Sequence, residues 1–140
     1  MIKINLLFFI LSLFLAACSS VDLFQPPPYE YQRWRRVGSS EDDVIRALLE
    51  CGVTTPRGRI RGRDEDVAMS PGEGALAARC MEGDGFKSDY DDSWVGYCRR
   101  WKQEIPACRE DAPVRKRDTE RRLNSIYCNE YPKARACQKT

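Results

Sequence analysis

Residues 39–52, SSEDDVIRALLECG, predict the helix around which the rest of the fold is built. Either Ser39 or Ser40 is suited to cap its N-terminus, and the aspartate three residues further on would form a capping box with that serine. Four apolar side chains recur at helical spacing and would share one buried face: Val44, Ala47, Leu48 and Cys51. Gly52 suits the left-handed position that ends a helix.

A second helix is predicted from residues 69–85, MSPGEGALAARCMEGDG. Ser70 is placed as its N-cap, Pro71 suits the first turn, Glu73 would complete a capping box, and a later glycine ends the helix. One face carries Leu76, Ala77 and Cys80. Since both helices have a cysteine in their last turn, we expect them to cross or to run roughly parallel. A bridge between these cysteines would close a loop of about 30 residues and contribute roughly 3–4 kcal/mol.

The N-terminus combines Lys3 with an apolar run, LLFFILSLFL, at residues 6–15. A helix of ten residues is roughly 15 Å long, about half of the roughly 30 Å hydrocarbon core that a membrane span must cross. A short apolar run between a positive charge and small residues is typical of a secretory signal.

The residues that end this run, Leu15-Ala16-Ala17-Cys18, resemble the lipobox of bacterial lipoproteins. In that family the signal is cleaved just before the cysteine, whose thiol carries a diacylglycerol and whose new amino group is usually acylated. The resemblance implies that residues 1–17 form a cleaved signal peptide and that the acyl chains on Cys18 anchor the protein in a membrane. Ser19 stands where an aspartate favours retention in the inner membrane of Gram-negative bacteria. The resemblance therefore implies the outer membrane, on its periplasmic face or at the cell surface.

The chain contains seven cysteines and no histidine. If lipidation uses Cys18, six remain: Cys51, Cys80, Cys98, Cys108, Cys128 and Cys137. An even number of cysteines in an oxidising compartment predicts three disulfides. A metal site is the alternative, but it would need cysteine and carboxylate ligands alone, and the sequence has no Cys-x-x-Cys pair. We expect neither a metal nor a cofactor.

The last third of the chain contains a weak internal repeat, YCRRWKQEIPAC at residues 97–108 and YCNEYPKARAC at residues 127–137. Each unit begins with Tyr-Cys, has an aromatic residue three positions after that cysteine and ends with Ala-Cys. The pattern predicts two small loops, each closed by its own disulfide. The alternative is a chance resemblance, since six cysteines allow fifteen pairings. Residues 109–122, REDAPVRKRDTERR, are highly charged, and their later part is predicted to be an exposed helical or irregular connector.

The mature chain has few aliphatic residues, and small domains of this kind usually need covalent cross-links. We predict a small, mainly α-helical, disulfide-stapled domain with irregular loops at residues 39–140, divided into a main unit (39–108) and an extension (109–140). Residues 18–38 contain three consecutive prolines and are predicted to be a lipidated tether that holds the domain away from the membrane.

The order of these motifs resembles a group of short, cysteine-rich outer-membrane lipoproteins of Gram-negative bacteria with no established role. The resemblance covers roughly residues 34–108 and includes the segments LLECG, ALAARCMEGDGF and PAC. It matches Cys51, Cys80, Cys98 and Cys108, and the loop that contains Cys128 and Cys137 would be an extension. The resemblance supports the fold and the location and implies no activity.

The overall charge gives no reason to expect nucleic acid as a partner. The chain has 23 basic and 21 acidic residues, and loss of residues 1–17 would leave 22 and 21. Two groups of residues are candidates for a binding surface. The tryptophans are Trp34, Trp94 and Trp101, although Trp34 could instead pack onto the domain. The arginines are Arg57, Arg59, Arg61 and Arg63, which could bind lipopolysaccharide phosphates or be neutralised by the acidic residues that follow them.

The sequence lacks the known catalytic patterns. Without histidine it cannot form a Ser-His-Asp or Cys-His arrangement, and it contains no phosphate-binding loop. Asp89, Asp91 and Asp92 lack the glycine and glutamate of an EF-hand and fit a solvated turn. We expect a binding or structural module without catalytic activity, whose partner is an envelope protein, glycan or lipopolysaccharide. A small envelope hydrolase or an enzyme inhibitor is the alternative, and it would need a concave site with converging carboxylates.

Overall fold

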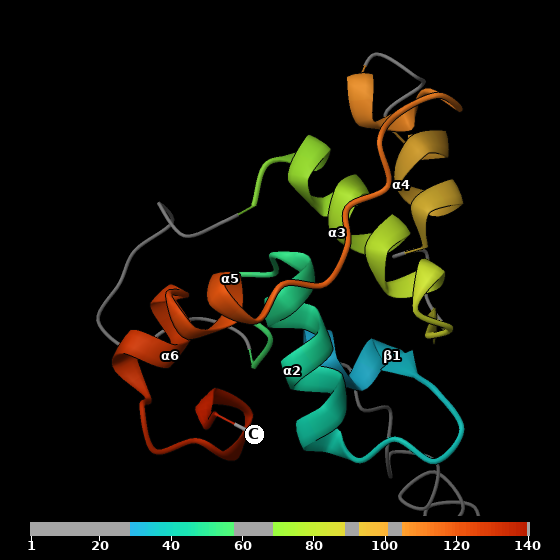
Figure 1. The fold of residues 1–140 in the computed structure, drawn as a ribbon. Helices are drawn as coiled ribbons and strands as arrows, with labels where there is room; N and C mark the ends of the chain where they lie inside the picture. The colour runs from blue at the N-terminus through green and yellow to red at the C-terminus, as the bar shows by residue number, and fades with distance from the viewer. Residues whose placement is uncertain (1–28, 58–68, 89–92, 101–104, 140) are drawn as a thin grey trace, which may run out of the picture.

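The computed structural model describes residues 29–57, 69–88, 93–100 and 105–139, which form a mainly helical domain with irregular loops (Figure 1). The structure therefore confirms the fold class that the sequence predicts. In chain order the elements are η1 (Glu30–Arg33), β1 (Trp34–Arg35), α2 (Glu41–Cys51), α3 (Pro71–Gly83), β2 (Lys87–Ser88), α4 (Trp94–Arg100), η3 (Pro106–Cys108), α5 (Thr119–Leu123), α6 (Ile126–Glu130) and η4 (Arg135–Cys137), where η denotes a 3-10 helix.

Helix α2 has the caps that the sequence predicts. The Ser40 hydroxyl accepts a hydrogen bond from the Asp43 N–H, and the Asp43 carboxylate accepts one from the Ser40 N–H at 2.9 Å. The Ser40 hydroxyl also donates to this carboxylate, and these hydrogen bonds hold the pKa of Asp43 below its ordinary value. At the other end Gly52 has a φ of 100°, the left-handed conformation that glycine adopts without strain.

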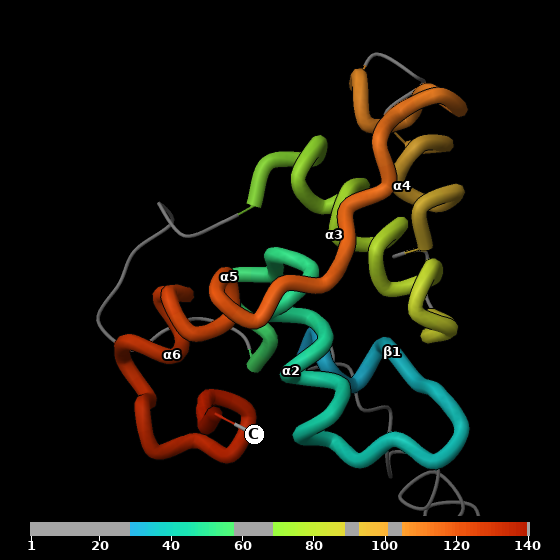
Figure 2. Tube along the Cα trace, in the orientation of Figure 1, coloured from blue at the N-terminus to red at the C-terminus, as the bar shows by residue number. Residues whose placement is uncertain are grey.

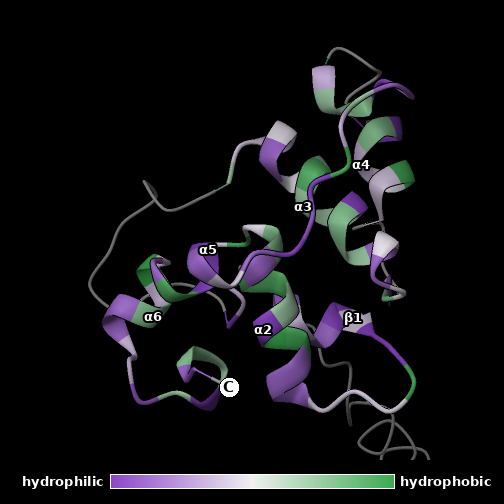
Figure 3. Cartoon of the chain, viewed as in Figure 1, coloured by the Kyte–Doolittle hydropathy of each residue, from purple (hydrophilic) through white to green (hydrophobic). Residues whose placement is uncertain are grey.

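Helix α2 is buried on two faces because it lies between α3 and the C-terminal helices (Figure 1). The predicted face packs into one cluster: Val44, Ala47, Leu48 and Cys51 with Ala77, Ala78, Cys80, Met81 and Phe86. A second face, not predicted, packs Ile45 and Leu49 against Tyr127, Cys128, Ala136 and Cys137. In Figure 3 much of α2, α3 and α4 is apolar, whereas the segment leading to α5 is largely hydrophilic.

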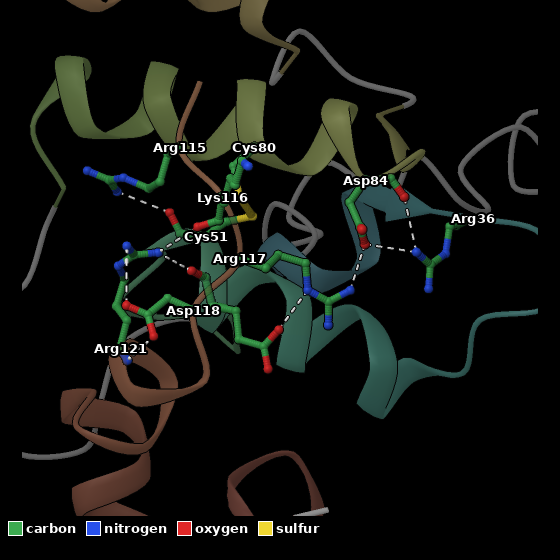
Figure 4. Close-up of a disulfide and its surroundings, with 10 residues drawn as sticks. Arg36, Cys51, Cys80, Asp84, Arg115, Lys116, Arg117, Asp118 and Arg121 are labelled. Carbon is green, nitrogen blue, oxygen red and sulfur yellow. Dashed lines mark hydrogen bonds and ion pairs between the residues drawn. A yellow bond between two sulfur atoms is a disulfide. The ribbon is translucent and has the colours of Figure 1, made fainter. Parts of the chain in front are cut away.

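Helix α3 crosses near the C-terminal end of α2 (Figure 2). The Cys51–Cys80 disulfide joins the two helices (Figure 4). The Ser70 hydroxyl caps α3 by accepting a hydrogen bond from the Glu73 N–H. Helix α3 packs against α4 and η3 with its other side, where Ala75 is fully buried. Leu76, expected on the buried face, is only half-buried and packs against this third cluster, which also contains Ala107 and Cys108.

The domain begins before residue 39, the boundary predicted from the sequence. Strand β1 pairs antiparallel with β2, with Trp34 opposite Ser88. The Trp34 side chain is 4% exposed in the α2–α3 cluster, and its indole N–H donates to Glu30 Oε1 at 3.2 Å. The prediction of Trp34 as a surface residue is therefore wrong, and the alternative that it packs onto the domain is confirmed. Residues 30–35 belong to the folded domain because burial of this indole fixes them there.

All six predicted cysteines form disulfides, Cys51–Cys80, Cys98–Cys108 and Cys128–Cys137. The internal repeat is also present in the structure. In each unit a short helix, α4 or α6, carries the first cysteine, and a 3-10 helix, η3 or η4, ends at the second. The pairing within each repeat therefore confirms the prediction of two separately closed loops.

The charged connector is helical in its later part, as predicted, but it is not simply exposed. Arg122 in α5 is 1% exposed, and its Nε donates to Glu50 Oε1 at 3.0 Å. Arg117 bridges Glu50 and Asp84, with both donor–acceptor distances at 2.6 Å. Arg36 donates to the same Asp84 carboxylate at 2.8 Å (Figure 4). A chain of ion pairs thus joins the N-terminal segment, α2, α3 and α5.

Two further arginines of this region cap the C-terminus of α2. Arg115 donates to the Cys51 carbonyl at 3.1 Å, and Arg121 donates to the Glu50 carbonyl (Figure 4). The last carbonyls of a helix have no partner within the helix, and the negative end of its dipole attracts cations. The connector therefore stabilises the end of α2 that carries the buried disulfide.

Candidate functional site

The candidate site is an open groove of about 1050 Å³ between the start of α2 and the loop that joins α6 to η4. We call it the α2–α6 groove. It is lined by Ser40, Glu41, Asp42, Ile45, Arg57, Tyr127, Glu130, Tyr131, Pro132, Lys133, Ala134, Arg135 and Ala136. Most of these residues belong to the second disulfide-closed repeat.

An aromatic pair forms one part of the groove. Tyr127 is 6% exposed and Tyr131 is 39% exposed, and their ring centroids lie 5.2 Å apart at an interplanar angle of 49°. Ile45 and Ala136 are buried beside this pair. The exposed ring of Tyr131 therefore rests on a packed support.

Four of the charged side chains that line the groove form two ion pairs. Arg57 forms an ion pair with Glu41, and Arg135 Nε lies 3.3 Å from Asp42 Oδ2. Burial raises the pKa of the Tyr127 hydroxyl, and the positive charge of Arg57 opposes this shift. Tyr127 is therefore a neutral phenol at neutral pH.

A disulfide and two hydrogen bonds hold the loop that lines the groove. The Cys128–Cys137 disulfide closes it, with the half-cystines only nine residues apart in sequence. Behind it, the buried Arg122 donates hydrogen bonds to the carbonyls of Ala136 and Gln138. The lining residues of η4 are consequently tied both to α6 and to the ion-pair network of α2.

The structure does not bring the predicted surface residues together. Arg57 lines the groove, where its guanidinium also lies 5.1 Å from the ring centroid of Tyr31. Trp94 is half-buried on α4, its indole N–H donates to the Ala107 carbonyl at 3.0 Å, and Arg79 covers its ring. The remaining predicted site residues lie outside the described residues: Cys18, Arg59, Arg61, Arg63 and Trp101.

Tyr131 and Arg135 line the groove but were not among the site residues predicted from the sequence. The signal that could have found them is the segment YPKARAC, which places an aromatic residue, a proline and two cations inside a short disulfide loop. The position of this segment next to α2 could not be deduced from the sequence. Arg135 contacts Asp42, and most of the sequence of the domain lies between these two residues.

The described ranges contain neither a cluster of metal ligands nor a membrane-spanning helix. No three histidine, cysteine, aspartate or glutamate side chains gather there in a manner that could hold a metal ion. The helices described there are also too short or too polar to cross a bilayer. Asp89, Asp91 and Asp92 fall in a segment for which no structure is described.

Comparisons with known proteins identify no relative. No protein-family model matches the chain, and neither the curated proteins nor the solved structures include a match.

Proposed function

We propose that the protein is a lipid-anchored binding module of the Gram-negative cell envelope. The observation that carries the proposal is the sequence LAAC at residues 15–18, which follows directly on a short apolar run. The disulfides support it, because they pair six of the seven cysteines and leave Cys18 for the lipid. Three disulfides also fit an oxidising compartment outside the cytoplasm.

In this proposal the acyl chains on Cys18 hold the protein in the outer membrane, and Ser19 at the sorting position directs it there. Several acyl chains anchor a protein stably, whereas a single chain gives marginal binding. The folded domain includes η1, which begins at Glu30, so the tether comprises at most the residues between Cys18 and Tyr29. The α2–α6 groove is the surface through which the module binds its partner.

The groove also contains the carboxylates that an envelope hydrolase would require: Glu41, Asp42 and Glu130. Two of them form ion pairs with arginines, Glu41 with Arg57 and Asp42 with Arg135. Carboxylates that are held by guanidinium groups fit a binding surface better than a proton donor and a nucleophile. We therefore keep binding, and not hydrolysis, as the proposed role.

Intact mass spectrometry of the protein purified from membranes tests the anchor. We expect a chain that begins at Cys18 and carries the mass of two or three acyl chains. Alkylation should modify no cysteine before reduction and six after it. An unlipidated chain would contradict the proposed anchor, and free thiols before reduction would contradict the oxidising compartment.

A further inference from the structure

We propose that the α2–α6 groove binds an uncharged oligosaccharide, a ligand class that rests on the binding role proposed above and makes it more specific. The groove combines three properties that suit a polyhydroxylated ligand: an exposed and supported aromatic ring, charged side chains whose formal charges cancel, and a loop closed by a disulfide.

The aromatic ring is Tyr131. It is 39% exposed, and Tyr127 supports it from the interior at a centroid distance of 5.2 Å. The ring of a sugar has a face of C–H groups that packs on an aromatic ring, and the phenol hydroxyl supplies a polar group at the edge. Tyrosine provides this contact with little loss of conformational entropy, because it has only two side-chain torsions.

The charge pattern argues against a charged ligand. The lining contains three acidic side chains (Glu41, Asp42, Glu130) and three basic ones (Arg57, Lys133, Arg135), so their formal charges cancel. An anionic ligand would compete with the carboxylates for the arginines, and a cationic ligand would compete with the arginines for the carboxylates. A sugar hydroxyl can both donate and accept a hydrogen bond, so it can bind next to an ion pair without breaking it.

The size and the rigidity of the groove fit several linked sugar rings. Its volume of about 1050 Å³ lies at the upper end of the roughly 300–1,000 Å³ that drug-sized ligands occupy. The Cys128–Cys137 disulfide closes the loop that carries Tyr131 and Arg135, so little conformational freedom remains to be lost on binding.

An extended peptide fits the groove less well. Peptides often bind by adding a strand to the edge of a sheet, which supplies their main chain with hydrogen bonds. Neither β1 nor β2, the strands of the described residues, lines the groove. The lining offers side chains in place of strand edges, and side chains are what a polyhydroxylated ligand needs.

The test is isothermal titration calorimetry of the mature lipidated protein in detergent micelles. The uncharged probes are maltotetraose and tetra-N-acetylchitotetraose, the anionic probe is tripolyphosphate, and the peptide probe is an uncharged octapeptide. We expect an uncharged tetrasaccharide to bind, and Tyr131→Ala to weaken its binding about tenfold or more. Tyr29→Ala, which removes an aromatic ring that is 52% exposed outside the groove, should leave the affinity unchanged.

A second variant, Arg135→Gln, keeps the proposal testable if Tyr131→Ala does not fold, because the Arg135 side chain is 84% exposed. Arg135→Gln should also weaken binding of the sugar. The proposal would be overturned by unchanged affinity in both variants or by failure of both sugars to bind. It would also be overturned if tripolyphosphate or the peptide bound more strongly than the sugars. The lipid measurement is separate: a lipidated protein that binds no sugar overturns the ligand class alone, and an unlipidated chain that binds sugar overturns the anchor alone.

Discussion

Gly74 sets how closely α3 and α4 approach, because the absence of a side chain leaves room for the ring of Tyr97. A Cβ atom at Gly74 would lie 2.7 Å from Tyr97 Cε1 and 2.9 Å from Cζ, which is well inside van der Waals contact. We expect Gly74→Ala to lower the free energy of unfolding by about 1–3 kcal/mol. Urea denaturation followed by circular dichroism measures the change.

Gly83→Ala in the same helix is the matched control. A Cβ atom there would meet only Val114 Cγ1, at 3.8 Å, which is ordinary contact. Since alanine favours a helix over glycine by up to about 1 kcal/mol, this variant should be as stable as the parent or more stable. Equal stabilities of the two variants would show that α4 does not pack closely on Gly74.

Arg122 and Glu50 form an ion pair whose side chains are 1% and 8% exposed. Removal of Arg122 leaves Glu50 with Arg117 as its remaining ion-pair partner, and it takes the donor away from the carbonyls of Ala136 and Gln138. A buried acceptor that loses its donor costs about 1–3 kcal/mol, so we expect Arg122→Ala to lower the free energy of unfolding by about 2–5 kcal/mol. The measurement is again denaturation by urea.

Arg135→Ala is the exposed counterpart of this variant. Its partner is Asp42, and their side chains are 84% and 28% exposed. An ion pair in contact with water contributes about 0–1 kcal/mol, so this loss should be small. If Arg122→Ala lowered the free energy of unfolding no more than Arg135→Ala, this result would contradict the structural role of the buried pair.

The N-terminus of helix α2 makes a pH-dependent contribution to the stability of the fold. The pKa of Asp43 is lower in the folded protein than in the unfolded chain, where it is about 3.9, because Ser40 stabilises the carboxylate by hydrogen bonds. The ionised form therefore stabilises the fold above about pH 4, and this contribution is lost as the pH falls through the folded-state pKa.

We expect the parent protein to be more stable than Asp43→Asn near neutral pH and the difference to shrink as the pH falls below about 4. Urea denaturation at a series of pH values measures this difference. Asp111→Asn, which removes one carboxylate at an exposed position outside the helices, is the matched control. A constant difference between the parent and Asp43→Asn across this range would exclude a role for the Asp43 charge in capping α2.

The elements that the sequence predicts well are those fixed by local chemistry. The caps of α2 depend on Ser40, Asp43 and Gly52, which lie within or next to the helix, and the two repeat disulfides join cysteines nine or ten residues apart. The elements and sites that it misses depend on distant partners. The burial of Arg122 requires Glu50, which is 72 residues away. The α2–α6 groove likewise exists only once α6 and η4 have packed on α2.

Helix α2 joins two of the three hydrophobic clusters that the described residues form, and a disulfide links residues in or against each of the three. The α2–α3 cluster contains Cys51 and Cys80, and the α2–α6 cluster contains Cys128 and Cys137. Cys108 lies in the third cluster, against which Cys98 packs. A chain with few aliphatic residues is stabilised in this way by one covalent link in every cluster.

This arrangement predicts the order in which the disulfides are reduced. A thiolate must reach a sulfur atom to reduce a disulfide, and Cys51 and Cys80 are 0% and 3% exposed, whereas Cys98 is partly exposed. In native buffer with limiting reductant, alkylation and peptide mapping should find Cys98 and Cys108 labelled first and the Cys51–Cys80 pair labelled last. In concentrated urea the order should disappear, because all three bridges are then exposed. Early labelling of Cys51 and Cys80 in native buffer would show that the central α2–α3 contact opens without unfolding of the domain.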